Sequence, residues 1–387
     1  MQDFELWWLL VFPVFFGLGW LAARIDMREV LRAAEVVPSS YFRGLSALVA
    51  DNTEHAVQAL AMVAKNQPRE RELQLALGQL YRRRGENDLA IRLHQTLLEA
   101  PEQTPAQLDE VRYELAEDYL RAGLVDRAEV LLVPLSKGAV AQQAQRRLLD
   151  IYQQERNWPR AIELSQTLHG SNVEQGHELA QYYCELAQSA LYHSKTDEAR
   201  HALTQAFNAN RRCTRANLLL GDLELSANNI EAALVAWMAI EAQNPDYLTL
   251  VAERVLDGYE HLERAAEGVK LVRGWLLTYP QLNVLDLLYA RVSSLEGDEA
   301  GLACLREAVH RQPTLLGLGK LIDAQFLQFT PDGRQDAELA RELITGYGKR
   351  LNVHRCKRCA FRSKTFFWHC PACGEWESFT PNASEAS

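Results

Sequence analysis

The sequence has no excess of positive charge. Lys and Arg number 41 against 51 Asp and Glu, which gives a formal net charge of −10 over 387 residues. A general nucleic-acid binder needs a basic face to neutralise phosphates, so the charge balance disfavours that class and predicts no nucleic-acid partner. Hydrophobic residues make up 48% of the chain and charged residues 24%, a composition typical of folded proteins.

Catalytic signatures are also missing. We find no Ser/His/Asp arrangement, no H-E-x-x-H pair and no phosphate-binding loop, and the ten histidines are dispersed. The sequence therefore predicts no catalytic residues and a protein that is not an enzyme. A disulfide framework is not expected either. Cys184, Cys213 and Cys304 are scattered through helical sequence and are predicted to be small buried residues, as in a chain from a reducing compartment.

One long hydrophobic run stands near the amino terminus. Leu6 to Ala23 contains 18 residues without a charge, which as a helix spans about 27 Å, close to the hydrocarbon core of a bilayer. Arginines follow at positions 24, 28 and 32, and the positive-inside rule then places the rest of the chain on the cytoplasmic side. We predict a single-pass inner-membrane anchor over residues 1–24 and a juxtamembrane helix or linker over 25–36.

Two alternatives to an anchor fit the run less well. A cleaved signal peptide has basic residues before its apolar run, whereas Asp3 and Glu5 precede this one. A helix of a globular protein usually packs one apolar stripe against the core, whereas this run is apolar on every face, which disfavours a buried core helix here. Both alternatives are therefore disfavoured.

A helical hairpin recurs through the middle of the chain. Residues 77–101 predict a helix, a tight turn at Gly85 and a second helix, with Gly78 and Ala90 where the two helices approach closely. This pattern resembles the tetratricopeptide (TPR) repeat of 34 residues. The small–alanine spacing recurs at Gly44 and Ala56, Ala116 and Ala128, Ala187 and Ala199, and Gly221 and Ala233. We predict an all-α TPR solenoid of about eight to nine helical hairpins over residues 37–350.

The first helices of a TPR array line a groove that usually holds a segment of a partner protein. On the predicted register, six residues of two neighbouring repeats face this groove: Leu75, Gln79, Arg82, Tyr113, Glu117 and Leu120. The alternative for each of them is an ordinary solvated face position. We predict these six as partner-groove residues.

Four cysteines near the carboxyl terminus form the sharpest chemical pattern. Cys356 and Cys359 make one C-x-x-C knuckle, and Cys370 and Cys373 make a second after ten residues. Two such knuckles supply the tetrahedral sulfur cage of a closed structural site. We predict that these cysteines hold one structural metal ion, zinc with iron as the alternative, in a zinc-ribbon or rubredoxin-like module over 351–380. Two redox dithiols are the other alternative.

The ribbon and the tail that follows it carry two further expectations. The ribbon has more aromatic residues than so short a segment can bury, so part of it is expected to dock against the last helical repeat and cap the solenoid. From Gly346 to Gly374 there are seven Lys or Arg and no acid, which predicts an acidic protein partner or the anionic inner leaflet, with nucleic acid as the alternative. Residues 381–387 are predicted to be a disordered tail.

The order of parts resembles a known family. The stretches GENDLAIRLHQTL from Gly85, YYCELA from Tyr182 and WHCPAC from Trp368 are similar to the lipopolysaccharide assembly protein B family of Gram-negative bacteria. That resemblance implies a non-catalytic inner-membrane adaptor that binds the membrane protease FtsH through its anchor. It would present to FtsH the deacetylase that commits precursors to lipid A, and would contact other lipopolysaccharide assembly proteins. A general TPR scaffold of another envelope complex and a rubredoxin-like iron redox protein are the alternatives.

Overall fold

The computed structural model describes residues 53–66, 70–101, 103–167, 173–326, 330–351 and 353–382, with single positions at 16, 18, 20, 42, 44, 46, 47, 49 and 50. These residues form two compact units, which divide between Gln154 and Glu155. The predicted anchor and linker lie outside the described residues, apart from Phe16, Leu18 and Trp20. Among the helices that are described, none has the length and apolar character needed to cross a membrane.

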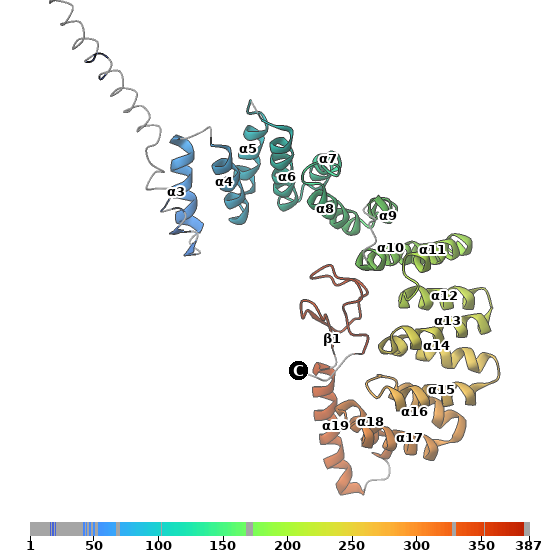
Figure 1. Ribbon diagram of the computed structural model, residues 1–387. Coiled ribbons are helices and arrows are strands. Elements are labelled where there is room, and N and C mark those ends of the chain that lie inside the picture. Colours follow the sequence, from blue (N-terminus) through green and yellow to red (C-terminus); the bar gives the residue numbers. More distant parts are fainter. Residues whose placement is uncertain are drawn as a thin grey trace, which may run out of the picture. The chain divides into compact units, whose positions relative to one another are not determined.

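The first unit contains helices joined by short turns (Figure 1). They are α3 (Thr53–Asn66), α4 (Arg71–Arg83), α5 (Asn87–Leu98), α6 (Pro105–Arg121), α7 (Val125–Leu135) and α8 (Ala141–Gln154). A capping box begins α6: Thr104 Oγ1 accepts the Gln107 N–H at 3.3 Å, and Gln107 Oε1 accepts the Thr104 N–H at 2.9 Å. Helix α4 packs with α5 and α6 with α7, the antiparallel pairing that the repeat predicts.

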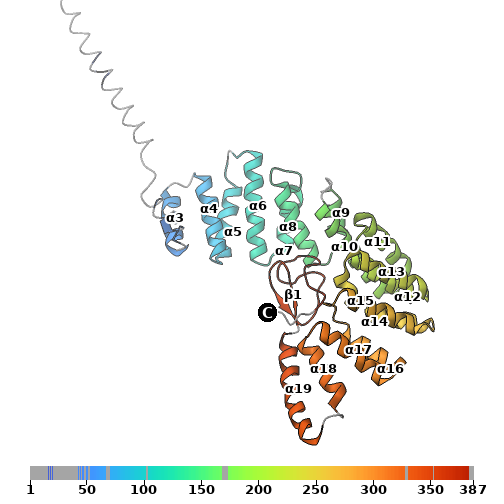
Figure 2. The ribbon, with the colours of Figure 1, turned by 60° about the horizontal axis from the view of Figure 1, so that its bottom comes forward.

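The second unit continues the helical pairs and ends in a small ribbon (Figure 2). Its helices are α9 (Trp158–Thr167), α10 (Val173–Tyr192), α11 (Thr196–Ala209), α12 (Thr214–Ser226), α13 (Ile230–Gln243), the 3-10 turn η1 (Pro245–Tyr247), α14 (Leu248–His261), α15 (Ala265–Thr278), α16 (Leu285–Glu296), α17 (Asp298–Arg311), α18 (Leu315–Gln325) and α19 (Pro331–Leu351). Strands β1 (His354–Arg355) and β2 (Arg362–Ser363) pair antiparallel. An all-α TPR array with a carboxyl-terminal ribbon is therefore confirmed for the described part of the chain.

The small residues are where the helices touch. A Cβ placed on Gly78 would lie 2.3 Å from His94 Nε2, and one on Gly221 would lie 2.1 Å from Trp237 Nε1. Ala90 in the facing helix is fully buried. Any larger residue at these glycines would push the two helices of the hairpin apart, which confirms the predicted close approach.

The turns inside several of the described hairpins use the left-handed backbone conformation. Gly85 (φ 81°) and Gly123 (φ 76°) supply it in the first unit, where glycine adopts it without steric cost. In the second unit Ser194 (φ 59°), Asn228 (φ 62°) and Glu263 (φ 58°) hold the equivalent turns. For an L-residue this conformation costs about 1–2 kcal/mol, so the packed helices on either side impose it.

The last hairpin is closed by the start of α19, which begins at Pro331 directly after Thr330. Thr330 Oγ1 accepts the Gly333 N–H at 3.3 Å, and Pro331 occupies the first helical position, where its missing N–H costs nothing. Helices α18 and α19 thus form a complete final pair.

Candidate metal centre and its docking surface

The two cysteine knuckles converge. The Sγ atoms of Cys356, Cys359, Cys370 and Cys373 all lie within 4.8 Å of one another, and Cys370 is fully buried. Each knuckle is closed by a backbone hydrogen bond, from Ala360 N–H to the Cys356 carbonyl and from Gly374 N–H to the Cys370 carbonyl. The residue after the second cysteine is left-handed in both, at Ala360 (φ 62°) and Gly374 (φ 68°).

The spacing of the sulfurs fits a tetrahedral metal ion. Cys356 and Cys373 Sγ are 3.8 Å apart, and Cys359 and Cys370 Sγ are 3.7 Å apart. A metal with bonds of about 2.3 Å to four sulfurs requires an edge of about 3.8 Å. These distances are much longer than a disulfide bond of about 2 Å. The four sulfur ligands would complete the coordination of one ion and leave no open position for a substrate.

One cysteine is held ready as a thiolate. Burial raises the pKa of Cys356, but its hydrogen bond with Ser378 and those from the N–H groups of Cys359 and Arg358 lower it to about 6 overall. His369 is not part of the cage, because its Nε2 bonds the Gly374 carbonyl at 3.1 Å and its ring packs on Trp376. Burial lowers the pKa of His369, which keeps that ring neutral.

The ribbon docks on helices that are distant along the chain from α19, the helix that precedes it. The expectation of a cap on the last helical repeat was therefore wrong. The second unit curves around the ribbon (Figure 1). Trp368 stacks on Tyr247 of η1 with centroids 5.1 Å apart, and Trp376 meets Trp158 of α9 and Tyr182 of α10 at 6.2 and 6.1 Å. These aromatic partners lie on the middle hairpins, and α19 instead exposes an apolar stripe of Leu339, Leu343 and Tyr347.

Arg215 on α12 is the centre of this docking surface. Its guanidinium carbon lies 5.6 Å from the Trp368 ring centroid and 5.8 Å from that of Trp376. The same guanidinium donates to Glu185 at 2.8 Å and to Gln188 at 2.7 Å. With 3% of its side chain exposed, Arg215 holds two ribbon tryptophans while helix α10 neutralises its charge.

Glu377 is the ribbon's polar contact with the helices. Its carboxylate lies 2.8 Å from His177 Nε2 and accepts a 2.8 Å hydrogen bond from Gln181, while the Tyr247 hydroxyl donates to its carbonyl at 3.4 Å. The backbone of Glu377 is left-handed (φ 48°), a conformation that the docked position imposes. Near the ribbon's end, Asn382 bonds Thr249.

This contact makes docking depend on pH. The hydrogen bond to Glu377 raises the pKa of His177, although burial opposes it. A raised pKa means that the ion pair stabilises the docked ribbon fully below the unfolded value of about 6.5 and is lost as pH rises through the folded value. We expect the free energy of unfolding of the second unit to fall by an amount on the order of 1 kcal/mol as pH rises above about 6.5, and its unfolding temperature to fall with it. Thermal unfolding followed by tryptophan fluorescence measures this.

His177→Gln is the matched control, because glutamine can still donate to Glu377 but does not titrate. The variant should lose the pH trend while keeping the docked state. Metal loss would give the opposite trend, since thiolates bind metal better as pH rises. A second unit that gains stability above about pH 6.5 would contradict the role of this pair.

The six predicted groove residues are largely engaged within the first unit. Leu75 is buried against Leu97 and Val111, and Leu120 is half-buried. Gln79 donates to Glu114 at 3.0 Å. Their contact with a partner stays a prediction.

The charged and aromatic members of that set join neighbouring repeats. Arg82 donates to Glu114 at 2.6 Å and to Asp118 at 2.8 Å. Glu117 accepts from Arg147 at 2.5 Å, and burial raises the pKa of Tyr113 beside this pair. These side chains therefore tie first helices together.

Sequence reasoning missed the buried polar residues. His94 and Asp118 are fully buried and joined at 2.5 Å, and Arg215, His177 and Glu377 were not singled out. A basic residue inside an apolar first helix, as in TRANLLLG from Thr214, is the one signal that could have pointed to Arg215.

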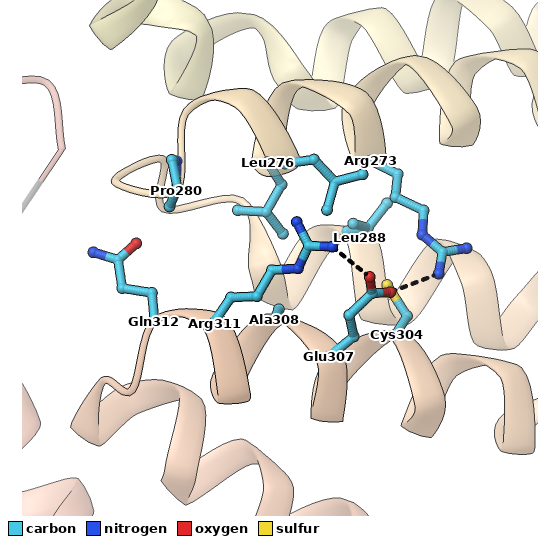
Figure 3. A pocket seen from close by; sticks show the side chains of 10 residues that line it. Arg273, Leu276, Pro280, Leu288, Cys304, Glu307, Ala308, Arg311 and Gln312 are labelled. Carbon is cyan, nitrogen blue, oxygen red and sulfur yellow. Dashed lines mark hydrogen bonds and ion pairs between the residues drawn. The ribbon is translucent and has the colours of Figure 1, made fainter.

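A cavity between α15 and α17 offers no alternative site (Figure 3). It holds about 30 Å³, room for one or two waters. Its polar groups satisfy one another, because Glu307 accepts from Arg273 at 3.0 Å and from Arg311 at 3.1 Å. Cys304 lies behind them, and burial raises its pKa, so it is not a poised thiolate.

Comparison with known families agrees with both parts of the chain. The family described as rubredoxin metal binding domain matches residues 354–381. The tetratricopeptide repeat family matches residues 41–105 and 184–247. The chain thus carries a four-cysteine metal-binding ribbon on a TPR scaffold.

Similar proteins cover nearly the whole chain. Lipopolysaccharide assembly protein B of Escherichia coli K12 is 28% identical over 387 residues, 97% of this chain and 98% of that one. Its namesake from Haemophilus influenzae is 28% identical over 400 residues, 98% of this chain and 99% of that one. A solved TPR repeat-containing protein from Cytophaga hutchinsonii aligns with TM-score 0.42 and 12% identity, over 62% of this chain and 95% of that one. The expected resemblance is confirmed, and it points with the fold to a non-enzymatic adaptor.

Proposed function

We infer that this lipopolysaccharide assembly protein works as an adaptor that regulates lipopolysaccharide synthesis. It would present the lipid A-committing deacetylase to the FtsH-type membrane protease, and it would coordinate other lipopolysaccharide assembly proteins. The observation that carries the proposal is the match to lipopolysaccharide assembly protein B along 97% of the chain. A repeat scaffold without an open metal position fits holding a client better than transforming one.

The parts of the chain would divide this task. The first helices α4 and α6 of the first unit offer the surface for the client, with Gln79, Arg82 and Glu117 as the polar contact candidates. We propose Cys356, Cys359, Cys370 and Cys373 as ligands of one structural ion, zinc by preference. When bound, that ion supplies the covalent cross-links that the short ribbon needs to fold, and the folded ribbon braces the second unit through Arg215.

The proposed location is the inner membrane. Residues 6–23 would form the single-pass anchor that brings the body to FtsH, with the bulk of the chain on the cytoplasmic side. The support is the uncharged run and the arginines after it.

The half-life of the deacetylase tests the adaptor role. We expect deletion of this gene to lengthen that half-life several-fold in a pulse-chase measurement, and the wild-type chain to restore it. A deacetylase that turns over at the same rate with and without the gene would instead favour a general TPR scaffold of another envelope complex. Visible absorption decides the third possibility, since a red, reducible iron centre would indicate a rubredoxin-like redox protein.

A further inference from the structure

The ribbon carries exposed basic side chains that its docking does not use. Trp368, Trp376 and Glu377 face the helices. Four basic side chains of the ribbon are exposed instead: Arg355, Lys357, Arg362 and Lys364. We call these four residues the basic face.

The basic face has no counter-charge within the described chain. Residues 353–382 contain two acids, Glu375 and Glu377. Glu375 pairs with Arg358, and Glu377 is engaged by His177. Among the residues that the structure describes, no carboxylate comes within ion-pair distance of the basic face, so its charge is available to an external anion.

Two of the cations are placed against each other. Arg355 and Arg362 are direct partners in the antiparallel register of β1 and β2, so their Cβ atoms lie about 4.5–5.5 Å apart on the same side of the hairpin. Like charges directly opposite destabilise a strand pair. This unfavourable pair becomes favourable when a single oxyanion accepts hydrogen bonds from both guanidinium groups, the geometry that Arg provides for phosphate.

We propose that the basic face binds the phosphate groups of an anionic lipid surface. The proposal rests on the membrane location proposed above, because only a chain held at a membrane would meet anionic headgroups. A protein partner normally needs an apolar, aromatic centre in its interface, and the large hydrophobic residue exposed on the described ribbon is Phe361, at 39%. A single-stranded nucleic acid needs free stacking aromatics, and Trp368 and Trp376 are used in docking.

Lysine labelling on the full chain tests the proposal. The chain is reconstituted in nanodiscs of neutral phosphatidylcholine or of the same lipid with anionic phosphatidylglycerol. Acetylation rates at Lys357 and Lys364 are then read by mass spectrometry against Lys195, the exposed lysine that directly precedes α11. We expect both ribbon lysines to be protected in the anionic discs only. Each cation near an anionic surface raises the binding constant about fivefold. The double substitution Arg355→Gln with Arg362→Gln should therefore weaken the binding that causes the protection about 25-fold.

The matched control removes two charges elsewhere. Arg211 and Arg306 are exposed cations of the second unit, and Arg211→Gln with Arg306→Gln should leave the protection unchanged. Metal content and unfolding temperature show that the ribbon remains folded in both variants. Relief of the like-charge pair should leave the Arg355→Gln, Arg362→Gln chain as stable as the wild type or more so.

The remaining arms separate the outcomes. Equal labelling in neutral and anionic discs, or equal protection in the two double variants, overturns the proposal. Protection by inorganic phosphate at matched ionic strength, by polyglutamate or by an RNA oligonucleotide, without protection by anionic discs, overturns it in favour of that anion. A chain that fails to co-purify with neutral discs contradicts the anchor. Flotation with anionic vesicles then tests the basic face alone, and binding must still depend on Arg355 and Arg362.

Discussion

Removal of the metal will unfold the ribbon and lower the unfolding temperature of the second unit by about 10 °C or more, while the first unit keeps its own transition. The ribbon has a small core, in which Cys356 and Cys370 pack with Phe379, so without the ion it has little to hold it. Structural zinc contributes about 10–16 kcal/mol to the folding of small zinc modules. Because Trp368 and Trp376 reach the helices from this core, their contacts with Arg215 are lost when it unfolds.

Cys370→Ser makes the same change without a chelator. We expect loss of bound metal, increased exposure of the ribbon tryptophans in fluorescence and the same fall in unfolding temperature measured by calorimetry. Cys304→Ser is the control, since Cys304 is a buried cysteine of α17 outside the cage, and it should keep the metal. A Cys370→Ser chain whose second unit unfolds at the wild-type temperature would show that the ribbon does not brace the helices.

Arg215→Ala will release the ribbon while leaving its metal in place. The side chain is 3% exposed and donates to Glu185 and Gln188, so its removal leaves a carboxylate without its partner and opens the space between two tryptophans. Breaking a buried ion pair from one side costs about 3–5 kcal/mol. We expect the second unit to lose stability of that order in thermal unfolding, with metal content unchanged.

Arg212→Ala is the matched control three residues earlier. Arg212 is exposed and donates to the carbonyls of Ala242 and Gln243, so its loss should change the stability by much less. Limited proteolysis gives a second measurement: the ribbon of Arg215→Ala should be cleaved faster than that of Arg212→Ala. Equal cleavage in the two variants would mean that Arg215 stabilises α10 and α12 without holding the ribbon.

The features that were predicted correctly are local in sequence. Gly78 and Ala90 are twelve residues apart, and the close approach that they permit follows from helix geometry alone. The two knuckles are likewise defined by spacing, since each C-x-x-C turn aims its own thiols. The buried state of Cys184 and Cys213 followed from composition, because free cysteine behaves as a small hydrophobic residue.

The features that could not be predicted from the sequence are contacts between distant residues and backbone conformations that packing imposes. Surplus aromatic residues predicted that the ribbon docks, but nothing local to Trp368 identifies Tyr247 as its partner. Ser194 and Glu263 do not favour the left-handed conformation by type, and they adopt it because packed helices meet there. The groove register illustrates a different limit, since Leu75 belongs by periodicity to a first helix but is buried between repeats.

The distance along the chain between the docked residues has a consequence for biosynthesis. Glu377 contacts His177 and Gln181 across 200 and 196 residues, and Tyr247 across 130. Domains fold in order as a chain leaves the ribosome, so the hairpins are complete before their brace exists. Only a chain translated beyond Glu377 can close this contact. Docking therefore distinguishes chains that contain the ribbon from chains terminated before it, which would expose the aromatic surface around Tyr247 to chaperones and proteases.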